Sequence, residues 1–217
     1  MLILLPPSEK KVQPRVGPIF ELDELCFSKE LGKVRRSLLR NQKEVTKLPT
    51  DIAVNVYSGV LYQAFQWETL ESKSQELGNS CVLISSALFG LLSPNDLIPA
   101  YKLKIQPSLW KIPIAKALKS YESELIIDCR SSSYAATWSP PRENTILVKV
   151  FEERSGEKTV ITHMAKKTRG EVARLLLMAG RDLMSFDDLQ DLVAKNYRCE
   201  LVAPTKVNGW QLEIIAN

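Results

Sequence analysis

A short cluster of cations in the sequence consists of Lys166, Lys167 and Arg169. Thr168 and Glu171 have the spacing of a capping box, and apolar residues at helical spacing follow. This pattern predicts a strand that ends at His163, a short basic turn, and a helix that begins at about Arg169. Cations at a helix N-terminus cost about a few tenths of a kcal/mol each in repulsion from the dipole. Such a cluster is understandable if an anion, most often phosphate, binds there, and the alternative is a solvated basic turn.

Further anion-site candidates follow predicted buried strands, and they are Lys10, Lys11, Arg130 and Ser131. The apolar run Leu2–Leu5 ends at two prolines, and the polar loop with the two lysines comes directly after it. Arg130 and Ser131 follow the apolar run Leu125–Cys129 in the same way. Ligand contacts in α/β proteins are usually placed at the carboxyl ends of buried strands. Solvated turns and helix caps are the alternative interpretation of these polar residues.

A third basic segment is predicted to be a helix that starts near Ser28. Between residues 29 and 47 it carries seven cations against two carboxylates, namely Lys29, Lys33, Arg35, Arg36, Arg40, Lys43 and Lys47 against Glu30 and Glu44. The outer face of this helix is either simply solvated or able to steer a polyanion. The whole chain has a net charge of +4 and a pI of about 8.8, which is compatible with a polyanionic partner.

The elements that position these residues alternate between strand and helix patterns, which predicts an α/β fold. The expected strands are Leu2–Leu5, Cys81–Ser85, Tyr101–Ile105, Leu125–Cys129, Arg198–Val202 and Trp210–Ile215, with a hairpin formed by Thr145–Phe151 and Lys158–His163. The expected helices start near Ser28, run from about Val60 to Leu77 and over Leu109–Tyr121, and open at Ser185 with Asp188 completing a capping box. We expect one compact domain over residues 1–217. It has a mixed central sheet, helices around it, and a basic cleft at the strand ends.

Several common activities have no support in the sequence. One histidine and four cysteines without a CxxC motif do not form a zinc or iron pattern, and Cys129 is expected to be a buried strand cysteine. Neither a P-loop nor a dinucleotide-binding glycine motif is present, so no cofactor, metal or catalytic residue is predicted. No signal peptide or membrane-length apolar run is found, which favours a soluble, cytoplasmic protein without a membrane partner.

Five stretches resemble the YaaA family of peroxide-stress-resistance proteins. They are Met1–Lys11 (MLILLPPSEKK), Val56–Phe65 (VYSGVLYQAF), Ile84–Ile105 (ISSALFGLLSPNDLIPAYKLKI), Ile126–Tyr134 (IIDCRSSSY) and His163–Leu177 (HMAKKTRGEVARLLL). The resemblance implies a compact single-domain α/β fold with a basic cleft, a role in surviving hydrogen peroxide and in limiting free iron, and binding of duplex and branched DNA. It also implies a helix-hairpin-helix-like element. By position this would include Tyr57 and Gly59, although the full hairpin glycine pattern is absent.

Two functional hypotheses follow, and a third is weaker. In the first, the protein binds DNA with low sequence specificity, with phosphate contacts from the cations at the strand ends. In the second, it is an enzyme that acts on a phosphorylated small molecule or nucleic acid, with Lys166, Lys167, Ser8 and Ser131 in the same cleft. The third, direct iron binding, is disfavoured by the single histidine. The sequence does not determine the oligomeric state.

Overall fold

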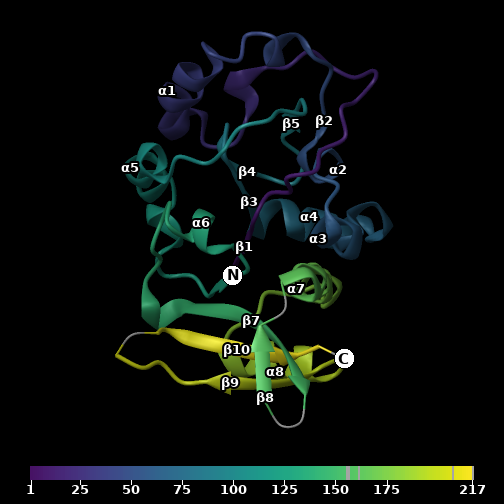
Figure 1. Cartoon of the computed structure of the whole chain (residues 1–217), viewed down its shortest axis with the longest axis vertical. Coiled ribbons are helices and arrows are strands. Elements are labelled where there is room, and N and C mark those ends of the chain that lie inside the picture. The colour runs from purple at the N-terminus through teal and green to yellow at the C-terminus, as the bar shows by residue number, and fades with distance from the viewer. Residues whose placement is uncertain (155–156, 161, 207, 217) are drawn as a thin grey trace.

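A mixed sheet joins the first strand of the chain to the last (Figure 1). The computed structural model describes residues 1–154, 157–160, 162–206 and 208–216. In this part of the chain the strand order is β4-β3-β1-β6-β7-β10-β9, and β8 pairs with β7. The strands are β1 (Leu2–Leu5), β3 (Val82–Ser86), β4 (Gly90–Leu92), β6 (Ile126–Asp128), β7 (Thr145–Arg154), β8 (Glu157–Val160), β9 (Arg198–Val202) and β10 (Trp210–Ile215). The predicted α/β class with a mixed sheet is confirmed.

Eight α-helices are described, and short 3-10 turns connect several elements. The helices are α1 (Ser28–Leu39), α2 (Ala53–Val56), α3 (Val60–Phe65), α4 (Ser72–Cys81), α5 (Pro107–Ala117), α6 (Ser132–Ala135), α7 (Thr162–Met178) and α8 (Phe186–Ala194). A small separate sheet pairs β2 (Asp51–Ile52) with β5 (Leu97–Ile98). In the described residues, no helix is both long and apolar enough to cross a lipid bilayer.

The central strands are covered by helices on both faces, which explains why they are continuous apolar runs. Leu2 and Leu4 of β1 belong to one hydrophobic cluster, together with Trp110 of α5. Ile3 and Leu5 point to the other face and belong to the cluster that includes residues of α3 and α7. All four β1 residues are fully buried. The period of two along a strand therefore divides the core into two layers of contacts.

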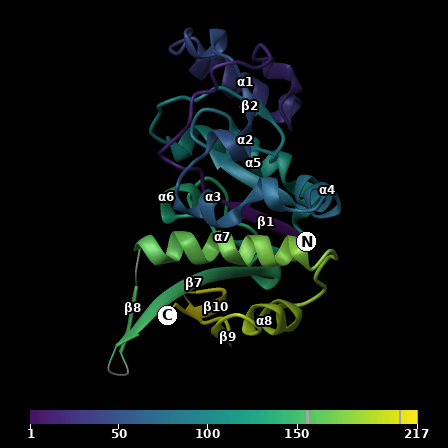
Figure 2. The same ribbon diagram turned by 90° about the vertical axis from the view of Figure 1, so that its right-hand side faces the viewer.

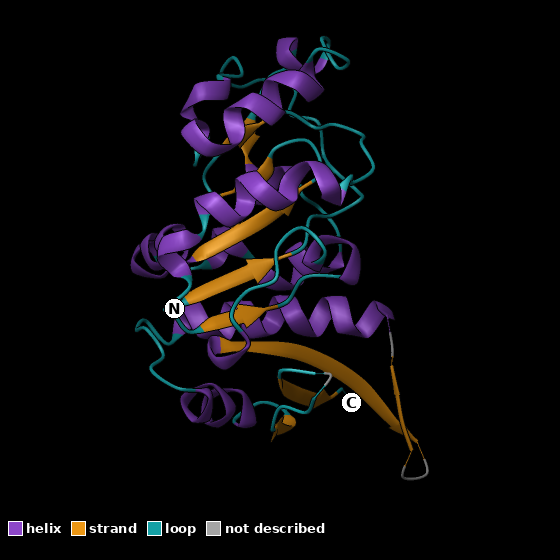
Figure 3. Ribbon diagram, turned by 90° about the vertical axis from the view of Figure 1, so that its left-hand side faces the viewer, coloured by secondary structure: helices purple, strands orange, loops and turns teal. Residues whose placement is uncertain are grey.

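The parallel strands β3, β1, β6, β7 and β10 all end at the same edge of the sheet. The loops after β1 and β6 lie at this edge, together with α3 and α6. Helix α7 runs in the opposite direction along the sheet, so its first turns lie at the same edge (Figures 2 and 3). Segments far apart in the sequence that carry predicted site residues are brought to one end of the sheet.

Helix α7 begins earlier than predicted, because the basic turn is itself helical. The helix starts at Thr162, and His163 lies inside it. Thr168 is only 1% exposed and lies in the middle of the helix, so the predicted capping box at this position is wrong. The segment before Thr168 contains no proline or glycine, and nothing interrupts helix propagation there. The predicted hairpin is confirmed, but β8 ends at Val160, and residue 161 lies outside the described residues.

Three other element predictions are wrong. The helix expected to reach Leu77 ends at Phe65, because Gln66 adopts a left-handed conformation with φ of 48°. Residues 101–105 do not form a strand. Ser28 does not cap α1, since Phe27 precedes the helix with φ of 54° and offers no side-chain cap. By contrast, the Ser185 cap of α8 is confirmed, with its hydroxyl oxygen accepting from the N–H of Asp188 at 3.1 Å.

Arg35 was expected on the solvated basic face of α1, but it points into the protein. Its side chain is fully buried, and it donates to the carbonyl oxygens of Phe89, Leu91 and Cys26, each at 2.8 Å. Two of these acceptors come from the β4 region, more than fifty residues away in sequence. Arg35 therefore anchors α1 to β4 and does not contribute to an outer cationic face.

Candidate nucleic-acid interface

The loop after β1 lies directly against the start of α3. The N–H of Ser58 donates to the carbonyl oxygen of Lys10 at 3.1 Å, and Lys11 pairs with Tyr57 in an antiparallel bridge. Gly59 precedes the first residue of α3. A Cβ atom at Gly59 would lie 2.3 Å from the hydroxyl oxygen of Ser8, so only glycine allows this approach without a shift. The tertiary structure thus brings together the two predicted sites around Lys10 and Gly59.

Lys11 is half-buried within this contact. Its ammonium donates to the carbonyl oxygen of Ser8 at 2.9 Å and lies 4.4 Å from the ring centre of Tyr101 and 5.4 Å from that of Tyr57. No carboxylate of the described residues is within ion-pair distance of it. The ring faces favour the charged ammonium, whereas burial favours the neutral amine, and burial lowers the pKa of Lys11 to about 8 despite nearby Glu9.

Lys11 packs against a group of buried tyrosines. The hydroxyl of Tyr101 is 2.9 Å from that of Tyr57 and 2.8 Å from that of Ser86. Tyr62 stacks on Tyr57 with ring centres 5.3 Å apart, and its hydroxyl donates to a backbone carbonyl oxygen at 2.8 Å. Burial raises the pKa of the Tyr57 phenol well above its usual value, so it stays protonated. Tyr57 was predicted to contact phosphate, but it is 1% exposed and acts here as a support.

Sequence reasoning missed the rest of this tyrosine group. Tyr62, Tyr101 and Ser86 all lie in stretches that carry the family resemblance, so a signal was present. Nothing local in the sequence showed that their side chains meet, because they come from α3, from β3 and from an irregular segment.

Helices α3 and α7 pack closely through Gly170. A Cβ atom at Gly170 would lie 2.1 Å from the carbonyl oxygen of Leu61. Beside this contact lies a groove of about 390 Å³, lined by Val60, Gln63, Ala64, Gln66, Lys167, Glu171 and Arg174. Lys167 is 3.6 Å from Glu171 and half-exposed, and Glu171 also accepts from Tyr197 at 2.6 Å. Lys166 is exposed and has no ion-pair partner in the part of the chain that is described.

Arg169 does not project from the surface with these lysines. Its Nε and Nη2 atoms donate to the carbonyl oxygen of Val148 in β7, at 3.2 and 3.1 Å. These bonds fasten α7 to the sheet. Lys166 and Lys167 remain exposed. Of the three clustered cations, Arg169 is therefore structural and the two lysines face solvent.

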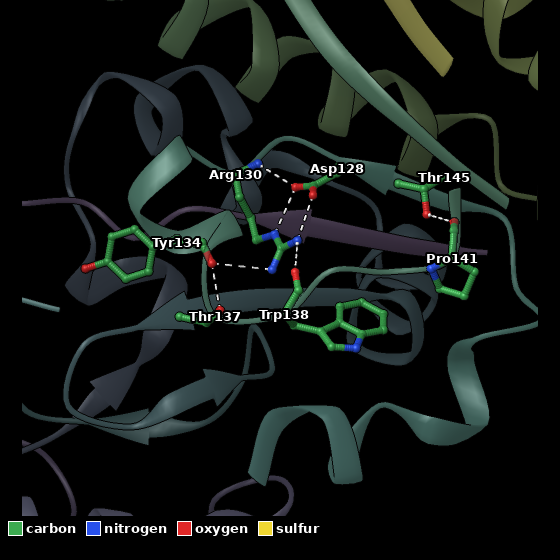
Figure 4. Close-up of polar contacts among 7 residues, drawn as sticks. All are labelled: Asp128, Arg130, Tyr134, Thr137, Trp138, Pro141 and Thr145. Atoms are coloured by element: carbon green, nitrogen blue, oxygen red, sulfur yellow. Dashed lines mark hydrogen bonds and ion pairs between the residues drawn. The ribbon is translucent and has the colours of Figure 1, made fainter. Parts of the chain in front are cut away.

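Arg130 is likewise engaged inside the protein (Figure 4). Its guanidinium forms a two-point ion pair with Asp128, with distances of 2.9 and 2.7 Å. It also donates to the carbonyl oxygens of Trp138 at 2.9 Å and Tyr134 at 3.5 Å. The side chain is 1% exposed, and a phosphate would have to displace these bonds. We therefore assign Arg130 a structural role. Ser131 is the residue before α6, is partly exposed, and forms no capping hydrogen bond with its side chain.

Cys129, between Asp128 and Arg130, is fully buried as expected. Burial raises the pKa of its thiol to about 12, so the thiolate form is rare at neutral pH. Among residues 1–154, 157–160, 162–206 and 208–216, no group of three histidine, cysteine or acidic side chains is placed to hold a metal ion.

Two kinds of comparison relate the chain to known proteins. The family model described as peroxide stress protein YaaA matches residues 21–201. A UPF0246 protein of Streptomyces coelicolor is 28% identical over 262 aligned positions that cover 100% of this chain and 99% of the relative. A UPF0246 protein of Corynebacterium efficiens is 30% identical and covers 88% of this chain and 91% of its own length. The chain therefore belongs to the YaaA family of peroxide stress proteins.

Proposed function

We propose that this protein binds DNA with low sequence specificity through the surface around α3, and thereby limits iron-dependent oxidative damage to DNA. The observation that carries the proposal is that exposed lysines from two distant segments of the chain lie next to this short helix. The backbone carbonyl oxygen of Lys10 accepts from the N–H of Ser58, which precedes Gly59. Lys167 lines the groove together with Val60 and Ala64 of α3. Lys166, which like Lys167 belongs to α7, is the third exposed cation of this surface.

The chemistry of this surface suits phosphate better than a base edge. Ammonium groups on flexible side chains act as point charges for phosphate oxygens and carry little sequence information. Gly59 precedes α3, and the backbone N–H groups of the first turn have no side-chain cap. Contacts of this kind supply affinity that falls with salt and is nearly independent of sequence.

Replacing both Lys166 and Lys167 with alanine should weaken DNA binding and its dependence on salt. Each lost phosphate contact reduces the slope of log K against log salt by about 0.9, so the double variant should lose roughly 1.8 units. Fluorescence anisotropy with labelled duplex and four-way-junction DNA at several salt concentrations measures both quantities. Arg169 stays unchanged in this variant, because it holds α7 on β7.

A matched control removes the same charge elsewhere. Lys116 and Lys119 are exposed and lie in or next to α5, on the other face of the sheet. Alanine at both positions should leave the slope nearly unchanged. An equal loss in both double variants, or no binding at low salt, would contradict the proposed interface. Salt-resistant binding of a free nucleotide would instead favour an enzyme that acts on a phosphorylated small molecule.

Protection of DNA from iron-dependent oxidative damage can be measured separately from binding. Peroxide and ferrous iron nick supercoiled DNA, and the wild-type protein should reduce the nicking in proportion to the DNA that it occupies. The Lys166 and Lys167 double variant should protect less at the same concentration. Protection that does not follow DNA occupancy would show that binding is not its cause.

A further inference from the structure

Lys11 differs from the other lysines at the strand-end edge. Lys10 and Lys166 are exposed, whereas Lys11 is half-buried on two tyrosine rings and has no carboxylate partner in the described residues. One backbone acceptor, the carbonyl oxygen of Ser8, holds its ammonium in place. A lysine in such surroundings is suited to act as a nucleophile rather than as a counter-ion.

We propose that Lys11 forms an imine with the deoxyribose aldehyde of an abasic site in bound DNA. This inference rests on the proposed DNA binding and names the damaged structure that the same surface would retain. Lys11 lies beside the start of α3, since it pairs with Tyr57, and the exposed Lys10 is its neighbour in sequence. Phosphates held by the surrounding lysines would place a sugar carbon of the same strand near the Lys11 amine.

The reaction needs no oxidant or reductant. The neutral amine attacks the C1′ aldehyde carbon of the ring-opened sugar, and a carbon–nitrogen bond forms. The carbonyl oxygen then takes up protons and leaves as water, so that amine, aldehyde and one proton give a protonated imine and water. The supporting tyrosines stay protonated, because burial raises the pKa of both Tyr57 and Tyr101.

The surroundings of Lys11 make this step easier for it than for an exposed lysine. Burial lowers the pKa of Lys11 to about 8, against 10.5 for an ordinary lysine. At neutral pH the fraction of neutral amine is then on the order of a hundredfold higher. The groups that face Lys11 are the uncharged rings of Tyr57 and Tyr101 and, further away, the carboxylate of Glu9.

A polar group in the same loop is also left without a partner. The hydroxyl oxygen of Ser58 is buried and has no hydrogen-bond partner among the described residues. Ser58 directly follows Tyr57 and contacts the backbone of Lys10. Buried hydroxyls are normally hydrogen-bonded, so this loop holds an unsatisfied polar atom beside the backbone contact with Lys10.

Trapping with borohydride tests the inference on the wild-type protein. A duplex with one abasic site, made by excising uracil, is mixed with the protein and with sodium cyanoborohydride, which converts an imine into a stable secondary amine. We expect a covalent protein–DNA complex with the abasic duplex and none with the intact duplex. Peptide mapping by mass spectrometry should place the adduct on Lys11. An adduct on Lys10, Lys166 or Lys167 would overturn the inference.

Two lysine variants compare the trapping reaction at Lys11 with trapping when a distant exposed lysine is changed. Lys11→Arg retains the cation but not the nucleophilic amine, and it should lose the covalent complex while still binding the abasic duplex. Lys116→Met, which changes an exposed lysine on α5, should form the complex as the wild type does. In the wild type, the initial rate of trapping should rise with pH through a midpoint near the Lys11 pKa of about 8.

Anisotropy with the same abasic duplex separates the two proposals. Binding without any trapped complex would overturn the role of Lys11 and leave the DNA-binding function intact. Absence of both binding and trapping would overturn both.

Discussion

Asp128→Ala should lower the free energy of unfolding by about 3–5 kcal/mol, because it leaves the guanidinium of Arg130 buried without its carboxylate. Both side chains are almost completely buried, with exposed fractions of 3% and 1%. Two carbonyl oxygens, from Trp138 and Tyr134, would remain as acceptors, but neither neutralises the charge. Urea denaturation at neutral pH measures the change.

An exposed ion pair is the natural control for this variant. Arg36 and Asp23 are 2.9 Å apart with exposed side chains, and Asp23→Ala should cost less than about 1 kcal/mol. The double variant Asp128→Leu and Arg130→Met should recover most of the loss, because hydrophobic residues often replace a buried pair at little cost. A loss below about 1 kcal/mol in Asp128→Ala would show that the pair does not support the loop after β6.

Gly170→Ala should destabilise the protein by about 1–3 kcal/mol, although alanine is the better helix former. The new Cβ atom would lie 2.1 Å from the carbonyl oxygen of Leu61, which is backbone and has no rotamer to change. Helices α3 and α7 would have to separate. Since Lys167 lines the groove between them, DNA affinity should fall as well.

The opposite sign is expected for Gly32→Ala in α1. There the three atoms nearest to the new Cβ atom all belong to the guanidinium of Arg36, the closest at 3.1 Å, and this end of a flexible side chain can move away. The gain in helix propensity should then stabilise the protein by up to about 1 kcal/mol. Thermal unfolding of both variants gives the comparison. Equal effects would show that the α3–α7 contact is not tight in solution.

Three arginines show where sequence reasoning about the site fails. Arg35, Arg130 and Arg169 all lie in basic or polar segments, and their sequence context predicts an outer or anion-binding surface for each. The structure turns each of them toward backbone carbonyl oxygens or a carboxylate within the protein. A guanidinium has five donors and a long apolar stem, so it can be buried wherever enough acceptors converge.

The exposed lysines behave differently from these arginines. Lys10, Lys166 and Lys167 remain at the surface, and an ammonium is more strongly hydrated than a guanidinium. Of the charged side chains in the predicted clusters, the lysines are therefore the better candidates for contact with a polyanion. The pocket of tyrosines around Lys11 could not be derived from the sequence, because its members are separated by up to about ninety residues.

Features that depend on neighbouring residues could be predicted from the sequence. The apolar runs predicted β1, β3 and β6, the turn signal predicted the β7–β8 hairpin, and Ser185 with Asp188 predicted the start of α8. Which cations are exposed and which are buried against acceptors depends on the tertiary structure. Two acceptors of Arg35 are 54 and 56 residues away in sequence, and the acceptor of Arg169 is 21 residues away. Gly170 is required by a carbonyl oxygen of another helix. Local patterns report burial and backbone preference, whereas the partner of a long polar side chain is set by how distant segments pack.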